Sequence, residues 1–222
     1  MRDQLTNVNL GSLLNYYIYS YDANGNRIKF TNPYEQPAQN NEVIDNYDRI
    51  TAHKSNVGEQ TYSYDAEGNM IDKHYYSDQS AMNSVKDIKY VFNYQNQITE
   101  IWVDGQRIAQ YQYDTGKQRI YSDTHYAGVD ETKLYNWDSA GHIIAESTVT
   151  GTILTKYIYA GNNKVAMVKP DGKGGETLYF FINDLQGTPV LITDTSGNVV
   201  QKTQTDPYGN VCLLYTSPSP RD

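Results

Sequence analysis

Short acidic turns are the feature of this sequence most able to do chemistry. Asp22 with Asn24, and again Asp65 with Glu67, stand beside glycines in the pattern Asp-x-x-Gly-Asn. Repeated acidic glycine loops hold calcium in some β arrays, but calcium needs roughly six to eight oxygen ligands. Each turn here offers only one or two suitable side chains. We therefore favour a structural role, in which the aspartate accepts hydrogen bonds from amides of its own turn.

Patterns typical of zinc, nucleophilic or phosphate sites are weak. The four histidines show no His-x-His or His-x-x-x-His spacing, so we expect surface or hairpin positions and no metal site: His53, His74, His125 and His142. Cys212 is the only cysteine, which excludes an internal disulfide. No Gly-x-Ser-x-Gly elbow occurs, and residues 171–175 lack the Lys-Ser/Thr ending of a phosphate loop. We interpret 171–175 as a hairpin tip between residues 165–168 and 177–180.

Three later aspartates could be mistaken for members of the carboxylate pair of a glycosidase, an enzyme that works with two acids at a fixed separation. Asp184, Asp194 and Asp206 each fit a turn, and the sequence gives no reason for any two to approach. We expect no catalytic residue, no cofactor and no metal, and hence no enzyme.

The acidic turns must be positioned by strands, because the sequence repeats. Residues 21–28 and 64–71 share the pattern Tyr-Asp-Ala-x-Gly-Asn-x-Ile, and aromatic-Asp or equivalent positions recur about every twenty residues. We align two further half-units at 46–51 and 93–99. The candidate structural residues are Tyr21, Asp22, Gly25, Asn26, Tyr64, Asp65, Gly68, Asn69, Tyr113, Asp114, Gly116, Trp137, Asp138 and Gly141.

Each copy predicts a β-hairpin. Residues before the turn, such as 16–21, are aromatic and β-prone, and residues after it, such as 27–30, alternate polar and apolar. The glycine supplies a positive-φ position that a β-branched residue occupies only at a cost. We therefore expect an all-β fold of repeated hairpins, with one short helix at 78–89 as the exception.

Composition limits the partners. Tyrosine supplies 22 residues, mean hydropathy is −0.70 and net charge is −8. Tyrosine rings can be buried only if their hydroxyls find partners or reach water, so the interior should be hydrogen-bonded. The negative charge opposes phosphate backbones, and we expect no nucleic acid partner. No stretch approaches the roughly 18 apolar residues of a membrane span.

The two ends depart from the repeat. Residues 1–15 are interpreted as the edge of a fragment, since they lack the apolar core of a signal peptide. Residues 212–222, which contain Cys212 and the Pro-Ser-Pro run, resemble the in-frame translation of a transposase-type sequencing adapter. We expect the natural sequence to end near Val211 and leave this tail out of the fold prediction.

Residues 16–211 resemble the YD repeats of Rhs proteins, toxin-complex shell subunits and animal teneurins, whose motif is Tyr-Asp followed by a Gly-Asn or Gly-Arg turn. We assign 16–178 to these repeats. Residues 179–211 resemble the start of the Rhs repeat-associated core, carried by Asp184, Gly187, Asp194, Gly197, Asp206, Pro207 and Gly209.

The resemblance implies a β-sheet strip of a spiralling, cocoon-like shell that encloses a C-terminal toxin or effector of the same bacterial protein. The expected role is thus a non-catalytic shell segment, secreted or at the cell surface, whose partner is that enclosed segment. The alternative is a cell-surface adhesin or carbohydrate-binding module, in which exposed tyrosine rows meet a glycan or a protein.

Overall fold

The computed structural model describes residues 7–9, 16–31, 39–55, 58–76, 86–205 and 211–216. Within these residues the chain forms nineteen strands and no helix, so none could cross a membrane as an apolar helix. The chain divides into two compact units, residues 1–110 and 111–222. The predicted all-β fold of repeated antiparallel hairpins is confirmed.

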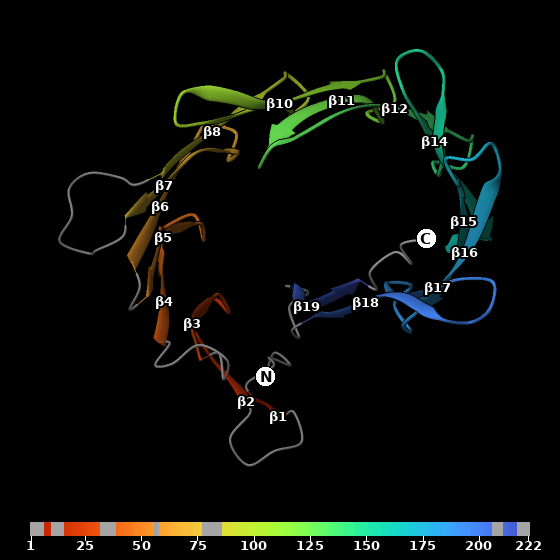
Figure 1. Ribbon diagram of the computed structural model, residues 1–222. Helices are drawn as coiled ribbons and strands as arrows, with labels where there is room; N and C mark the ends of the chain where they lie inside the picture. Colours follow the sequence, from red (N-terminus) through yellow and green to blue (C-terminus); the bar gives the residue numbers. More distant parts are fainter. Residues whose placement is uncertain are drawn as a thin grey trace. The chain divides into compact units, whose positions relative to one another are not determined.

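The first unit is a succession of antiparallel strands, each hydrogen-bonded to the next along the chain (Figure 1). Its last strand, β10, continues three residues past the boundary of the unit. The strands are β1 Asn7–Asn9, β2 Tyr16–Tyr21, β3 Arg27–Thr31, β4 Gln39–Ile44, β5 Ile50–Ser55, β6 Gly58–Tyr64, β7 Met70–Tyr76, β8 Lys86–Phe92, β9 Ile98–Val103 and β10 Gln106–Tyr113.

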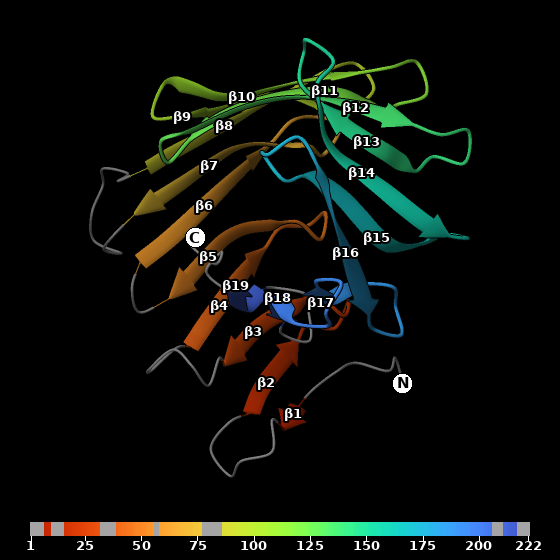
Figure 2. The same ribbon diagram turned by 45° about the vertical axis from the view of Figure 1, so that its right-hand side comes forward.

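The second unit has the same organisation, and Figure 2 shows β11 to β16 side by side in chain order. Its strands are β11 Arg119–Tyr126, β12 Val129–Trp137, β13 Ile143–Ser147, β14 Ile153–Ala160, β15 Asn163–Pro170, β16 Glu176–Asn183, β17 Pro189–Thr193, β18 Val199–Thr205 and β19 Val211–Thr216. Because consecutive strands are antiparallel, every second loop lies at the same edge of the unit.

Side chains alternate between the two faces of each strand, as the pleat requires. In β8 the half-buried residues are Lys86, Ile88, Tyr90 and Phe92, and the residues between them are exposed. Burial is shallow: six hydrophobic residues are buried among those described, three of them alanines, and no large side chain is fully shielded. The six are Tyr19, Ala52, Ala109, Ala166, Met167 and Ile192.

Tyrosine rings pack against cationic side chains, and these contacts replace some of the packing that a deep core would provide. In the first unit Lys73 Nζ lies 5.5 Å from the Tyr62 ring centroid and 4.7 Å from that of Tyr75. The Tyr62 hydroxyl donates to Gln60 Oε1 at 3.0 Å, and burial raises the pKa of Tyr62 to about 12. Such cation–ring contacts stabilise by about 0.5–1 kcal/mol each at partly exposed sites.

Several local expectations can be compared with the strands. The hairpin at 171–175 is confirmed, since it joins β15 to β16. The short helix at 78–89 is wrong for residues 86–89, where alternating burial accompanies strand β8, while 77–85 lie outside the described residues. The predicted boundary at 178/179 falls inside β16, and β19 continues from Val211 into the tail. The assignment of that tail to an adapter stays a prediction.

Candidate functional site

Ten five-residue turns of one design join the strands. The amide of position 1 donates to the carbonyl of position 5 at 2.8–3.0 Å, and in all but one turn the amide of position 4 donates to the carbonyl of position 1. In nine of them this is a type I turn closed by a positive-φ residue, a common three-residue hairpin connection. Turn 171–175 differs, because Gly172 at position 2 also has positive φ. The turns are 22–26, 45–49, 65–69, 93–97, 114–118, 138–142, 148–152, 171–175, 184–188 and 194–198.

The carboxylate at position 1 holds the turn together. Asp22 Oδ1 accepts the amides of positions 3 and 5, at 2.9 Å and 2.8 Å, while its Oδ2 accepts the side chain of Asn26 at 3.0 Å. Asp138 repeats this arrangement with the amides of Ala140 and His142. These donors compete with any cation for the carboxylate oxygens. Among the described residues no group of three or more potential metal ligands gathers.

These hydrogen bonds also change acidity. The pKa of Asp22 and of Asp65 is lowered from 3.8, mainly because the position-5 asparagine donates to each carboxylate. The pKa of Asp138 is lowered by the amide of His142. A lowered pKa keeps the carboxylate charged, so that it accepts hydrogen bonds from its own turn. A general acid needs the opposite, a raised pKa, because it must hold a proton.

The aromatic residue before the turn reaches the neighbouring hairpin. The Tyr64 hydroxyl donates to the carbonyl of Ile50 at 2.6 Å, and Trp137 Nε1 donates to the carbonyl of Arg119 at 2.8 Å. Each acceptor is the first strand residue after the preceding turn at the same edge. Tyr159 does the same to Ile143 at 3.1 Å, before a shorter turn. We call these three contacts the edge clasps.

Position 5 of the preceding turn packs on the clasp ring. Arg49 pairs with Asp45 at 2.8 Å, and its guanidinium carbon lies 4.8 Å from the Tyr64 ring centroid. His142 pairs with Asp138 at 3.0 Å and stacks on Tyr159 with ring centroids 4.5 Å apart. The same relation thus occurs in both units, and it links the turn to the clasp that follows it.

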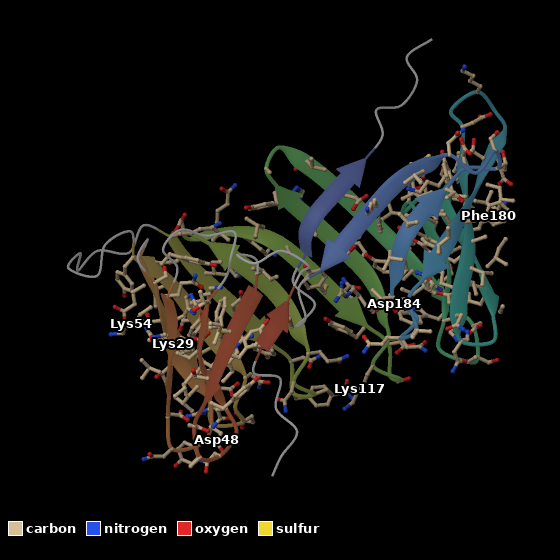
Figure 3. All side chains as sticks on the ribbon, turned by 90° about the horizontal axis from the view of Figure 1, so that it is seen from below. Lys29, Asp48, Lys54, Lys117, Phe180 and Asp184 are labelled. Atoms are coloured by element: carbon tan, nitrogen blue, oxygen red, sulfur yellow. The ribbon has the colours of Figure 1, made fainter. Side chains whose placement is uncertain are left out.

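Neighbouring turns in the first unit also touch directly. Asn24 and Asn26 both donate to Asp48 Oδ1, at 2.9 Å and 2.7 Å, and Asn69 donates to Asn96 Oδ1 at 3.0 Å. Figure 3 shows Asp48 at a turn, whereas Lys29 and Lys54 lie along β3 and β5, where both are in register with Asn41 of β4. The edge is therefore a row of linked turns.

The structure places most sequence-predicted residues at defined turn positions. Asp22, Asp65, Asp114, Asp138, Asp184 and Asp194 occupy position 1; Gly25, Gly68, Gly141, Gly187 and Gly197 occupy position 4 with positive φ; Asn26 and Asn69 occupy position 5; and Tyr21, Tyr64, Tyr113 and Trp137 directly precede a turn. Gly116 differs, because it lies at position 3 and the positive-φ residue is Lys117. Asp206, Pro207 and Gly209 lie outside the described residues.

The alignment of the half-units needs correction. In turn 45–49 the acid that closes the turn is Asp45, not Asp48, because Asp45 Oδ1 accepts hydrogen bonds from the amides of Tyr47 and Arg49 at 2.8 Å and 3.0 Å. Asn93 takes this role in 93–97, as does Thr148 in 148–152. In the sequence, these turns are marked by the residue at position 4, three places after the acceptor. The aromatic residues Tyr47 and Tyr94 instead favoured an alignment that was shifted along the chain.

The glycosidase-like pair does not assemble from the described residues. Asp184 and Asp194 lie in turns at opposite ends of β17, which has five residues. At about 3.3 Å per strand residue they stand roughly 17 Å apart, beyond the separation that either glycosidase mechanism uses. Asp206 lies outside the described residues.

All four histidines lie within hydrogen-bonding distance of a carboxylate. Their partners are Glu42 for His53, Asp87 for His74, Asp123 and Asp130 for His125, and Asp138 for His142. Most of these pairs join neighbouring strands. The histidines thus contribute to strand pairing at hairpin positions.

A family model described as Teneurin YD-shell matches residues 1–218. The chain belongs to this YD-shell family. The predicted resemblance is confirmed. The match continues seven residues past Val211.

The curated relative found is the tRNA3(Ser)-specific nuclease WapA of Bacillus spizizenii, 26% identical over 206 residues. The alignment covers 92% of this YD-shell chain but 8% of WapA, so the chain spans a small part of that relative.

Two solved structures that match this chain cover most of it at low sequence identity. The crystal structure of TcdB2-TccC3-TEV gives a TM-score of 0.43 at 15% identity and covers 91% of this chain and 14% of the other. The Photorhabdus luminescens Tc holotoxin pore gives 0.31 at 12% identity, covering 90% and 15%.

Proposed function

We propose that this segment is a non-catalytic part of the wall of a secreted or cell-surface Rhs-type shell, and that the wall encloses a C-terminal toxin or effector segment of the same protein. The edge clasps carry the proposal. Each of the three fastens one hairpin to the preceding one, which suits a continuous wall. The turn carboxylates meanwhile accept hydrogen bonds from backbone amides of their own turns.

The shallow burial supports the same role. A free-standing domain of this length would bury a substantial core, whereas only six hydrophobic residues are buried among those described. Apolar side chains such as Ile158, Phe180 and Ile182 are 45%, 42% and 46% exposed. Strands in a repeat array rely on neighbouring repeats for cover, so this segment is suited to function within a longer array.

Limited proteolysis of the full-length protein tests the enclosure. We expect the segment C-terminal to this chain to resist protease in the native protein and to become sensitive when two clasps are removed by Tyr64→Ala with Trp137→Ala. Tyr94→Ala is the matched control, since that ring is 92% exposed at a turn. A downstream segment cleaved equally fast in all three proteins contradicts the proposal.

One observation favours a second role, that of an adhesin or carbohydrate-binding module. Tyr47 and Tyr94 stand at turn tips with 78% and 92% of their surface exposed, and exposed aromatic rings are common in recognition surfaces. An adhesin predicts cell-surface binding that Tyr47→Ala with Tyr94→Ala abolishes while the downstream segment stays protease-sensitive throughout.

A further inference from the structure

One lysine of the second unit is surrounded by aromatic rings. Lys164 is the second residue of β15, and its Nζ lies 4.0 Å from the ring centroid of Tyr157. The same nitrogen lies 5.9 Å from the centroid of Tyr159 and 6.0 Å from that of Phe181. These rings come from β14 and β16, the two neighbours of β15 in the sheet (Figure 2). We call the three rings the lysine cage.

The tyrosines of the cage are held in place without help from the lysine. The Tyr157 hydroxyl donates to Glu146 Oε1 at 2.8 Å, and the Tyr159 hydroxyl donates to the carbonyl of Ile143 at 3.1 Å. Tyr159 is the strand partner of Lys164, just past a register shift in β14, so the two side chains share a face of the sheet. The cage is therefore preorganised around the lysine.

Within the part of the chain that the structure describes, the Lys164 ammonium has no hydrogen-bond acceptor and no ion pair. Glu146 acts on it through its charge, but Oε1 of this residue accepts from Tyr157 and Oε2 pairs with Lys133 at 3.1 Å. The N–H groups of Lys164 thus face ring surface. Their lost contact with water costs free energy, which the attraction between cation and rings offsets only in part.

Partial burial makes the Lys164 nitrogen a better nucleophile and favours methyl groups on it. Burial lowers the pKa of Lys164, while the charge of Glu146 opposes this shift. A lowered pKa increases the fraction of neutral amine, which is the form that attacks an electrophile. N-methylation keeps the positive charge that the rings attract and removes N–H groups that require water.

The two longer distances leave room for methyl groups. A methyl carbon lies about 1.5 Å from its nitrogen and packs on ring carbons at about 3.5–4 Å, so it spans roughly 5–5.5 Å from nitrogen to ring. This span fits the 5.9 Å to Tyr159 and the 6.0 Å to Phe181. The 4.0 Å to Tyr157 is too short for it. The geometry therefore suits two methyl groups.

We propose that Lys164 is a site of N-dimethylation and that the lysine cage holds the dimethylated side chain. The methyl donor is a sulfonium compound, used by a protein methyltransferase. In each transfer the neutral amine attacks the methyl carbon, the N–C bond forms, and the S–C bond breaks with its electron pair left on sulfur. One proton passes to water between the two transfers, so the product remains a cation. The exposed residues 161–163, directly before Lys164, give the enzyme access.

This site goes beyond the shell role and does not depend on it, because a wall segment can enclose a downstream segment with or without methyl groups on Lys164. Proteolytic protection therefore tests the first proposal, and mass spectrometry tests the second.

The first test is mass spectrometry of peptides from the full-length protein isolated from its native source. We expect two methyl groups on Lys164 and none on Lys156 or Lys169, which are exposed lysines of the neighbouring and the same strand. Lys164 that is mainly unmodified, monomethylated or trimethylated overturns the proposal. Methyl groups spread equally over the three lysines show general surface methylation and overturn it as well.

The second test asks whether the cage holds the product. Formaldehyde with dimethylamine–borane dimethylates the lysines of the unmodified full-length protein without an enzyme, and hydrogen exchange of β15 and β16 is compared before and after. Phe181→Leu removes one ring of the cage, and Phe181→Met is a second variant without that ring. Phe180→Leu is the matched control, since Phe180 lies on the opposite face of β16 and is exposed (Figure 3). Thermal melting checks that the variants remain folded.

We expect dimethylation to raise the protection of β15 and β16 about two- to fivefold in the parent protein and in Phe180→Leu. The gain should be absent in both Phe181 variants. No gain in the parent, or an equal gain in all the proteins, shows that the cage does not hold the dimethylated lysine and overturns the proposal.

Discussion

The Tyr64 hydroxyl donates a 2.6 Å hydrogen bond to the backbone carbonyl of Ile50, fourteen residues earlier and one hairpin back. This contact explains why an aromatic donor precedes the turn acid. The acid closes its own turn, and the aromatic residue joins that turn to the preceding one. Tryptophan replaces tyrosine at residue 137 without loss of the contact, because the indole N–H also donates.

Removing the Tyr64 hydroxyl should loosen the first unit. Tyr64→Phe keeps the ring beside Arg49 but leaves the Ile50 carbonyl without this donor, which costs about 0.5–1.5 kcal/mol. Native-state hydrogen exchange of β5 and β6 in the full-length protein measures this local opening. Tyr94→Phe, at an exposed tip, should change it by less than about 0.5 kcal/mol. Equal effects of the two substitutions would show that the clasp does not stabilise the edge.

Gly68 tests the turn backbone without steric interference. Its φ is +89°, and a Cβ there would meet no atom within 4 Å, so Gly68→Ala should cost only the left-handed backbone strain, about 1–2 kcal/mol. Gly68→Asn should cost less, because Asn96 holds the same turn position at a φ of 60°. Hydrogen exchange of β6 and β7 compares the two. Asparagine as harmful as alanine would contradict this reading.

The turn aspartates should make the fold sensitive to acid. The folded pKa values of Asp22, Asp45 and Asp65 are lowered from 3.8, so the folded state binds fewer protons than the unfolded chain. Their contribution is therefore present above about pH 4 and is lost as pH falls through the folded pKa values. Thermal melting of the full-length protein between pH 7 and pH 3 should show this loss.

Asp65→Asn provides the matched control for that pH dependence, since Asn93 performs the same role in another turn through its amide oxygen. We expect the variant to keep turn 65–69 while the acid sensitivity of β6 and β7, followed by hydrogen exchange, decreases. If acid opens these strands equally in both proteins, the carboxylate of Asp65 is not the cause.

The contribution of His125 to stability should change with pH in the opposite direction. Hydrogen bonds from its ring to Asp130 and then to Asp123 raise the pKa of His125 above 6.5. The resulting stability is fully present below pH 6.5 and is lost as pH rises through the folded pKa. Asp130→Asn should shift the pKa back toward 6.5, measured by NMR titration of the ring protons. A pKa that does not move would rule out the Asp130 contact.

Much of the fold follows from the repeat in the sequence. The Tyr-Asp turns at 22 and 65 combine an aromatic residue, an acid and a positive-φ glycine, so all local signals agree and the hairpins form as expected. The predicted alignment of turns 45–49 and 93–97 was shifted, because Tyr47 and Tyr94 lie inside these turns and resemble the aromatic residue that precedes the acid in the other repeats. The correct acceptors, Asp45 and Asn93, follow Ile44 and Phe92, which lack a hydroxyl.

The edge clasps could not be predicted from the sequence. They join residues fourteen to eighteen positions apart, and their geometry depends on the register between hairpins, which local patterns do not fix. Each hairpin with a clasp has a register shift just before its turn, as at Ser63/Tyr64 and Asn136/Trp137. The same shift occurs at Val43/Ile44, so it belongs to this type of turn.

A cryo-electron-microscopy structure of the full-length protein would decide whether this segment is part of an enclosing wall. We expect residues 16–205 to form part of a closed wall, with the clasped turns along one edge of the strip and a C-terminal segment enclosed on one face of the sheet. A structure in which these strands lie open to solvent on both faces, with the C-terminal segment outside, would contradict it.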